Sequence, residues 1–126
     1  MNSKVLIIDD EESIRSVLIR AISSLGYDVK AAADGHTGIS LCNEWNPDII
    51  LTDIFMPEQD GLEIIRSLRK TLPGVPIIAM SGGGNMGHLD VLRTARAMGA
   101  VNNLSKPFEI SDLKDALESA AETDRK

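Results

Sequence analysis

Carboxylate, hydroxyl and lysine side chains each follow an apolar run of this chain. Four acids stand together at residues 9–12, and a further carboxylate, Asp53, follows a later run. A serine, Ser81, and a lysine, Lys106, follow two more runs. Carboxylate oxygens bind hard divalent cations, and few carboxylates with several waters favour Mg²⁺ over a full Ca²⁺ cage. A carboxylate nucleophile, a cation, a hydroxyl and an ammonium together suit phosphoryl transfer, because they bind and neutralise phosphoryl oxygens.

Each of these residues also has a simpler interpretation when it is taken alone. Glu11 and Glu12 precede a helical segment, where acids interact favourably with the helix dipole. Asp53 could be an ordinary turn residue and Lys106 a solvated surface lysine. The combination favours a site, because unrelated turn residues need not place acids, a hydroxyl and a lysine after four different runs.

Five short apolar runs alternate with segments of helical spacing. The runs are residues 5–8, 29–33, 49–51, 75–80 and 101–104. Several of them are continuous, which is typical of parallel strands covered on both faces. The alternation predicts a doubly wound α/β domain, in which ligands bind beyond the carboxyl ends of the strands, where the strand order reverses. If the first and third strands are neighbours, Asp9, Asp10 and Asp53 converge there.

Helix boundaries and buried helix faces follow from the same pattern. Gly26 is expected to end the first helix, and Asp34 and Ser111 are expected to begin two others. The expected apolar helix residues are Ile14, Val17, Leu18, Ala21, Ile22 and Leu25 in the first helix, Val91, Leu92, Ala95 and Met98 in the fourth, and Ile110, Leu113, Leu117 and Ala120 in the fifth.

Length and composition limit the class of protein. The chain has 126 residues, 43% hydrophobic and 25% charged, with a formal net charge of −6. We expect one soluble domain over residues 1–126, with its core at about 4–120 and a short frayed C-terminal tail. The acidic balance argues against a nucleic-acid partner, and without an apolar run of about 20 residues no membrane partner is expected. A single cysteine, Cys42, excludes an internal disulfide. The sequence also shows no signal-peptide pattern and no apolar run of about 20 residues, so we expect a cytoplasmic protein.

The motifs as a set resemble the receiver domains of response regulators, the CheY-like family of two-component and phosphorelay signalling. The resemblance covers about Lys4 to about Ala120. Its carriers are VLIIDDE at 5–11, DIILTDIFMP at 48–57, DGLE at 60–63, PIIAMS at 76–81, and the stretch from Gly99-Ala100 to Lys106-Pro107-Phe108. The resemblance implies a flavodoxin-like (βα)5 fold with a five-stranded parallel sheet of order 2-1-3-4-5.

The resemblance also implies how the acids act. Asp53 would be the phosphoacceptor. Asp10 and Asp53 would bind Mg²⁺ directly, together with the backbone carbonyl of Phe55. Asp9 would act largely through water.

The remaining site residues of the family correspond to four positions. Ser81 would donate a hydrogen bond to a phosphoryl oxygen and Lys106 would pair with it, while the peptide bond before Pro107 would be cis and aim the lysine. Most receivers carry Tyr or Phe three residues before the lysine, whereas this chain has Asn103. In the family that aromatic ring swings inward as the hydroxyl moves toward the phosphoryl group. We therefore expect atypical output through the fourth-helix, fifth-strand and fifth-helix face.

The expected function is that of a phosphoacceptor signalling module. A histidine kinase or a histidine phosphotransfer protein would supply the phosphoryl group to Asp53, and a downstream protein would recognise the product. The domain would catalyse only its own phosphorylation and dephosphorylation, and would not be an enzyme in the wider sense.

Parts of the sequence also suit three other functions. An aspartyl-phosphate phosphatase usually needs a second acid two residues after the nucleophile, where this chain has Phe55. A pseudo-receiver that only docks partners is mildly favoured by Asn103, but the complete set of acids, hydroxyl and lysine argues against it. Gly82, Gly84 and Gly87 match a dinucleotide fingerprint, yet they follow the fourth strand instead of the first.

Overall fold

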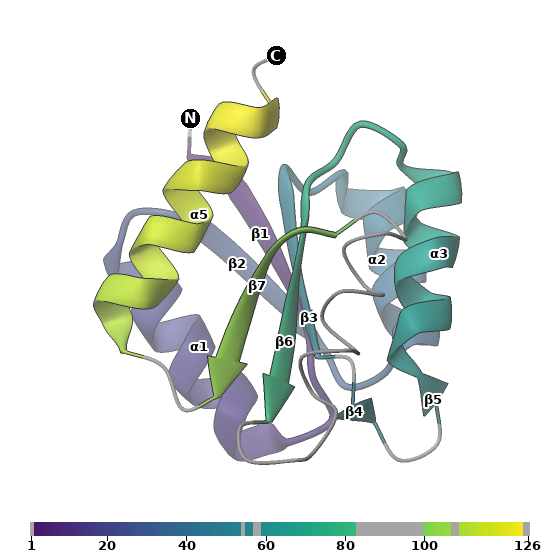
Figure 1. Cartoon of the computed structure of the whole chain (residues 1–126), viewed down its shortest axis with the longest axis horizontal. Coiled ribbons are helices and arrows are strands. Elements are labelled where there is room, and N and C mark those ends of the chain that lie inside the picture. Colours follow the sequence, from purple (N-terminus) through teal and green to yellow (C-terminus); the bar gives the residue numbers. More distant parts are fainter. Residues whose placement is uncertain (1, 54, 57–58, 83–99, 107–108, 125–126) are drawn as a thin grey trace.

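Strands and helices alternate along the chain (Figure 1). The computed structural model describes residues 2–53, 55–56, 59–82, 100–106 and 109–124, with side chains for 2–53, 63–80 and 109–121. The strands are β1 (Lys4–Ile8), β2 (Asp28–Ala32), β3 (Ile49–Asp53), β4 (Phe55–Met56), β5 (Gln59–Asp60), β6 (Ile77–Gly82) and β7 (Ala100–Lys106). The helices are α1 (Glu12–Ser24), α2 (Gly35–Trp45), α3 (Gly61–Thr71) and α5 (Ile110–Asp124). The fourth helix expected from the sequence lies outside the described residues.

Five of the strands form one sheet in the order β2-β1-β3-β6-β7, and all neighbours in it are parallel. In chain order this is 2-1-3-4-5, so the predicted flavodoxin-like α/β fold is confirmed. The chain leaves β1 to form β2 on one side and returns to form β3 on the other. The strand order therefore reverses at β1, and that is where ligands bind in open α/β sheets.

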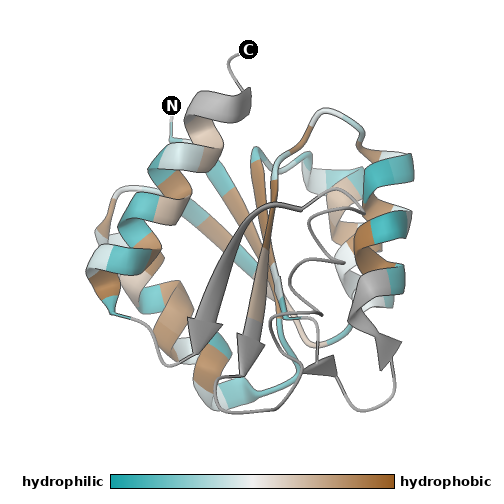
Figure 2. Cartoon of the chain, in the orientation of Figure 1, coloured by the Kyte–Doolittle hydropathy of each residue, from teal (hydrophilic) through white to brown (hydrophobic). Residues whose placement is uncertain are grey.

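The central strands are buried on both faces, which explains their continuous apolar runs. In β1, Leu6 and Ile8 pack into a cluster with residues of α2 and α3, while Val5 and Ile7 pack into a second cluster with residues of α1 and α5. All four side chains are 0% exposed, and burying a side chain of this type contributes about 1.5–3 kcal/mol. Figure 2 shows the result as apolar colour along β1 and β3 and polar colour on the outer faces of the helices.

Helix ends follow local sequence at two of the three predicted positions. Gly26 has φ +98° and its N–H donates to the Ser23 carbonyl, which makes it the residue that ends α1. Asp34 accepts a hydrogen bond from the Thr37 N–H at 2.7 Å and begins α2. The prediction for Ser111 is wrong, because α5 begins at Ile110.

Two residues expected in buried helix faces are instead exposed. Val17 of α1 is 65% exposed and Ile110 of α5 is 59% exposed. The sequence also gave no indication of the short antiparallel pair β4–β5, in which Phe55 is opposite Asp60. In the part of the chain that the structure describes, no helix has the length and apolar character needed to cross a membrane.

Trp45, the last residue of α2, lies near the start of β1. Its half-buried ring packs against the apolar cluster that contains residues of α2 and α3. The Lys4 and Lys30 ammonium groups lie 5.9 and 5.2 Å from its centroid, within cation–π range. The Lys4 ammonium also donates to the Trp45 carbonyl at 3.1 Å, so the end of α2 is tied to the first residue of β1.

Candidate functional site

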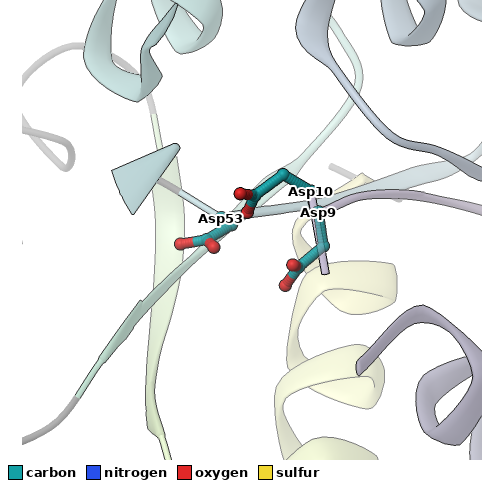
Figure 3. A group of neighbouring side chains, drawn as sticks. All are labelled: Asp9, Asp10 and Asp53. Atoms are coloured by element: carbon teal, nitrogen blue, oxygen red, sulfur yellow. The ribbon is translucent and has the colours of Figure 1, made fainter. Parts of the chain in front are cut away.

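Three aspartates from two neighbouring strands meet at the carboxyl end of the sheet. Asp9 and Asp10 directly follow β1, and Asp53 is the last residue of β3. The register pairs Ile8 with Thr52, so the two strands end at the same level. One carboxylate oxygen from each aspartate lies within 4.8 Å of the others (Figure 3). The convergence expected from the sequence is therefore present in the fold.

The three carboxylates differ in their exposure to solvent. Asp9 is 0% and Asp53 is 3% exposed, whereas Asp10 is exposed. Two like unit charges about 4 Å apart repel by about 4 kcal/mol at an effective dielectric of 20. This repulsion favours a positive charge beside the cluster. The start of α1 directly after the acids supplies part of it, because the N-terminus of a helix carries a partial positive charge.

Backbone and side-chain hydrogen bonds hold the loop that carries Asp9. The Asp9 N–H donates to the Ala32 carbonyl of β2 at 3.1 Å. The Asp9 carboxylate accepts from the Glu11 N–H at 2.9 Å, and the Arg15 guanidinium donates to the Asp9 carbonyl at 2.8 Å. Sequence reasoning did not single out Arg15, because an arginine in the first turns of a helix is ordinarily a solvated residue.

The ends of β6 and β7 lie at the same end of the sheet as the acids. Asp53 pairs with Met80, so Ser81 is one residue beyond the level of Asp53. Lys106 is the last residue of β7 and pairs with Gly82 one position further. Asn103 is in register with Ala79, inside β7. The roles predicted for these side chains remain predictions, because the structure describes only the backbone there.

Two further predicted positions follow β3 and β7. Phe55 lies in β4, two residues after Asp53, so the carbonyl expected to bind Mg²⁺ follows the acid closely in the chain. Pro107, with the expected cis bond before it, lies outside the described residues.

The donor set at this site fits Mg²⁺. Its three candidate ligands are carboxylates, which suit a hard divalent cation. Asp10 is exposed, so solvent reaches the site and water could complete an octahedral shell. Within the described part of the chain, the group contains no thiolate or imidazole, the ligands that favour zinc or copper.

Comparison with known proteins identifies the family. The profile of the response regulator receiver domain matches residues 5–118. The chain belongs to the response regulator receiver domain family. Among curated relatives, this receiver domain is 32% identical over 117 residues to sporulation initiation phosphotransferase F of Bacillus subtilis, covering 93% of this chain and 92% of that protein.

Longer relatives carry the same domain as one part of their sequence. The receiver domain is 34% identical over 116 residues to the DNA-binding transcriptional regulator NtrC of Proteus hauseri, but it covers only 24% of that protein. Among solved structures, a response regulator receiver domain protein from Clostridium thermocellum has a TM-score of 0.90 and 30% identity, with 98% of this chain and 97% of that chain covered.

Proposed function

We propose that this receiver domain accepts a phosphoryl group on Asp53 from a phosphohistidine, in a Mg²⁺-dependent reaction, and passes the signal to a downstream protein. The observation that carries the proposal is the convergence of Asp9, Asp10 and Asp53 within 4.8 Å where the strand order reverses. The B. subtilis relative is named a phosphotransferase, which supports phosphoryl transfer as the chemistry.

In the proposed reaction a carboxylate oxygen of Asp53 attacks phosphorus. The new oxygen–phosphorus bond forms as the bond from phosphorus to the donor's histidine nitrogen breaks, and the electron pair of that bond stays on the imidazole. Asp10 and Asp53, with the backbone carbonyl of Phe55 and with Asp9 acting largely through water, would hold Mg²⁺, which when bound neutralises charge on the phosphoryl oxygens. The Ser81 hydroxyl would donate to one of these oxygens and the Lys106 ammonium would pair with another. Hydrolysis of the acyl phosphate by water regenerates Asp53 and inorganic phosphate.

The partners in the proposal are a histidine kinase or a histidine phosphotransfer protein, and a downstream protein. The downstream partner would bind the face of β7 and α5, to which the sequence also assigns the predicted fourth helix. We place this exchange in the cytoplasm and assign the domain no catalysis beyond its own phosphorylation and dephosphorylation. A nucleic-acid partner is not part of the proposal, because the chain carries a net charge of −6.

Intact mass measurement tests the phosphoacceptor directly. The wild-type domain, incubated with Mg²⁺ and acetyl phosphate, is expected to gain about 80 daltons, the mass of one phosphoryl group. Asp53→Asn is expected to abolish the adduct. The matched control is Asp115→Asn, which removes an exposed carboxylate of α5 and should leave the adduct in place.

Two outcomes would count against the proposal. An adduct that survives in Asp53→Asn would place the phosphoryl group on another residue. Absence of any adduct in the wild type would favour a pseudo-receiver that only docks partners, as Asn103 mildly suggests.

A further inference from the structure

Arg15 connects the first turns of α1 to the loop that carries two of the three acids. Its backbone N–H donates to the Glu11 carbonyl at 3.0 Å, the first helical hydrogen bond of α1. Its half-buried guanidinium reaches back and donates to the Asp9 carbonyl at 2.8 Å. Helix and loop are thus joined by one charged side chain.

The carbonyl that Arg15 holds belongs to the peptide group between Asp9 and Asp10. A peptide group is planar, so fixing its oxygen also fixes the direction in which the chain enters Asp10. The Asp9 N–H and carboxylate are already bonded to Ala32 and Glu11. Asp10 is exposed, so burial does not restrain its side chain. The Arg15 hydrogen bond acts directly on the peptide group that precedes Asp10 and helps to orient it.

We infer that Arg15 is a positioning residue of the Mg²⁺ site, acting through the Asp9 carbonyl to orient the Asp10 carboxylate. The inference rests on the proposed function, because Mg²⁺ binding by the three aspartates is part of that proposal. Arg15 itself contacts neither the cation nor the phosphoryl group in this role.

The positive charge of Arg15 and its proposed positioning role predict opposite effects on Mg²⁺ affinity. A guanidinium close to a cation site repels the cation, so a purely electrostatic role means that removing the charge strengthens Mg²⁺ binding. A positioning role means that removing the side chain weakens binding, because the Asp10 carboxylate is no longer held in place. The sign of the change in affinity thus separates the two roles.

The test is a Mg²⁺ titration followed through the backbone amide NMR signals of residues 9–12. Arg15→Met is expected to weaken Mg²⁺ binding by about tenfold, in the range found for residues that orient metal ligands. Arg15→Lys restores a cationic donor and should recover part of the loss. Arg20→Met is the matched control, since Arg20 is an exposed arginine of the same helix, and its affinity should match the wild type.

The outcomes are decisive in either direction. Unchanged or tighter Mg²⁺ binding in Arg15→Met would overturn the inference, as would an Arg15→Lys variant that binds no better than Arg15→Met. Thermal unfolding in EDTA checks that each variant is folded. If Arg15→Met does not fold, Arg15→Lys is compared with the wild type instead. The titration needs no phosphodonor, so a domain that binds Mg²⁺ but never gains a phosphoryl group would refute the proposed function and leave this inference standing.

Discussion

Asp10 is the exposed member of an acid cluster whose other two members, Asp9 and Asp53, are 0% and 3% exposed. Asp9 is tied to β2 and to the start of α1 by hydrogen bonds. Asp10 is therefore the residue at which a single charge can be removed with least disturbance of packing. It is also a proposed direct ligand of Mg²⁺, so its two contributions to stability have opposite signs.

Asp10→Asn is expected to stabilise the domain without divalent cations and to remove most of the stabilisation that Mg²⁺ gives. In EDTA the loss of one like charge should raise the free energy of unfolding by about 0.5–1 kcal/mol, as for partly exposed charge pairs. In the wild type, Mg²⁺ at 100 times its dissociation constant should add about 2.7 kcal/mol. Urea unfolding followed by circular dichroism, with EDTA and with Mg²⁺, measures both. A variant less stable than wild type in EDTA would contradict the prediction.

The acids of the site can be predicted from the sequence, but Arg15, the proposed positioning residue for Asp10, cannot. Asp9, Asp10 and Asp53 could be brought together because each follows an apolar run, and parallel strands end at one side of a sheet. Arg15 acts on a backbone carbonyl. A carbonyl is present at every position, so no residue type or spacing marks which one a side chain will reach.

The start of α2 is fixed by a side-chain cap. Asp34 accepts the Thr37 N–H at 2.7 Å. That hydrogen bond to the backbone of Thr37 is the main cause that lowers the pKa of the Asp34 carboxyl below its usual value. The charged form of Asp34 therefore favours the folded state.

Asp34→Ala is expected to lower the free energy of unfolding by about 1 kcal/mol, whereas Asp34→Asn, which keeps the acceptor oxygen, should lower it by less. Because the folded pKa is lowered, the contribution of the charge is present above the unfolded pKa of about 3.8 and is lost as pH falls through the folded value. Urea unfolding of the three proteins at neutral pH and below pH 4 measures both effects. Equal stability of Asp34→Ala and wild type at neutral pH would rule out the cap.

Elements were predicted best where burial is complete. The run 5–8 is apolar throughout because both faces of β1 are covered, and it forms a strand as expected. The margins of a buried helix face are harder to predict, because consecutive helical residues point about 100° apart. Val17 is therefore turned well away from its buried neighbour Leu18. The pair β4–β5 has two residues in each strand, too few to produce a periodic pattern.

Burial of the Cys42 thiol makes the stability of the fold depend on pH at high pH. Its side chain is 0% exposed, in the cluster between the sheet and α2. Burial raises the pKa of the thiol to about 11 from its ordinary 9.0. The unfolded chain therefore loses this proton at a lower pH than the folded domain, and the stability due to Cys42 is complete below about pH 9 and is lost as pH rises toward 11.

The stability difference between wild type and Cys42→Ala is expected to shrink by about 2 kcal/mol between about pH 8 and about pH 10.5. The variant keeps every other titrating group, including Tyr27, whose pKa is also raised by burial. Their contributions cancel in the difference between the two proteins. Denaturant unfolding at a series of pH values provides the measurement. A difference that stays constant with pH would show that the thiol does not ionise on unfolding.

The position of Trp45 determines which events its fluorescence can report. It is the single tryptophan of the chain and lies against Lys4, the first residue of β1, whereas the acids follow the last residue of that strand. The acids begin five residues after Lys4, and each strand residue adds about 3.3 Å. Intrinsic fluorescence of this domain should therefore follow loss of the fold and remain nearly silent when the acids bind a cation. The protein thus carries its own fluorophore for stability measurements, at the opposite end of β1 from its chemistry.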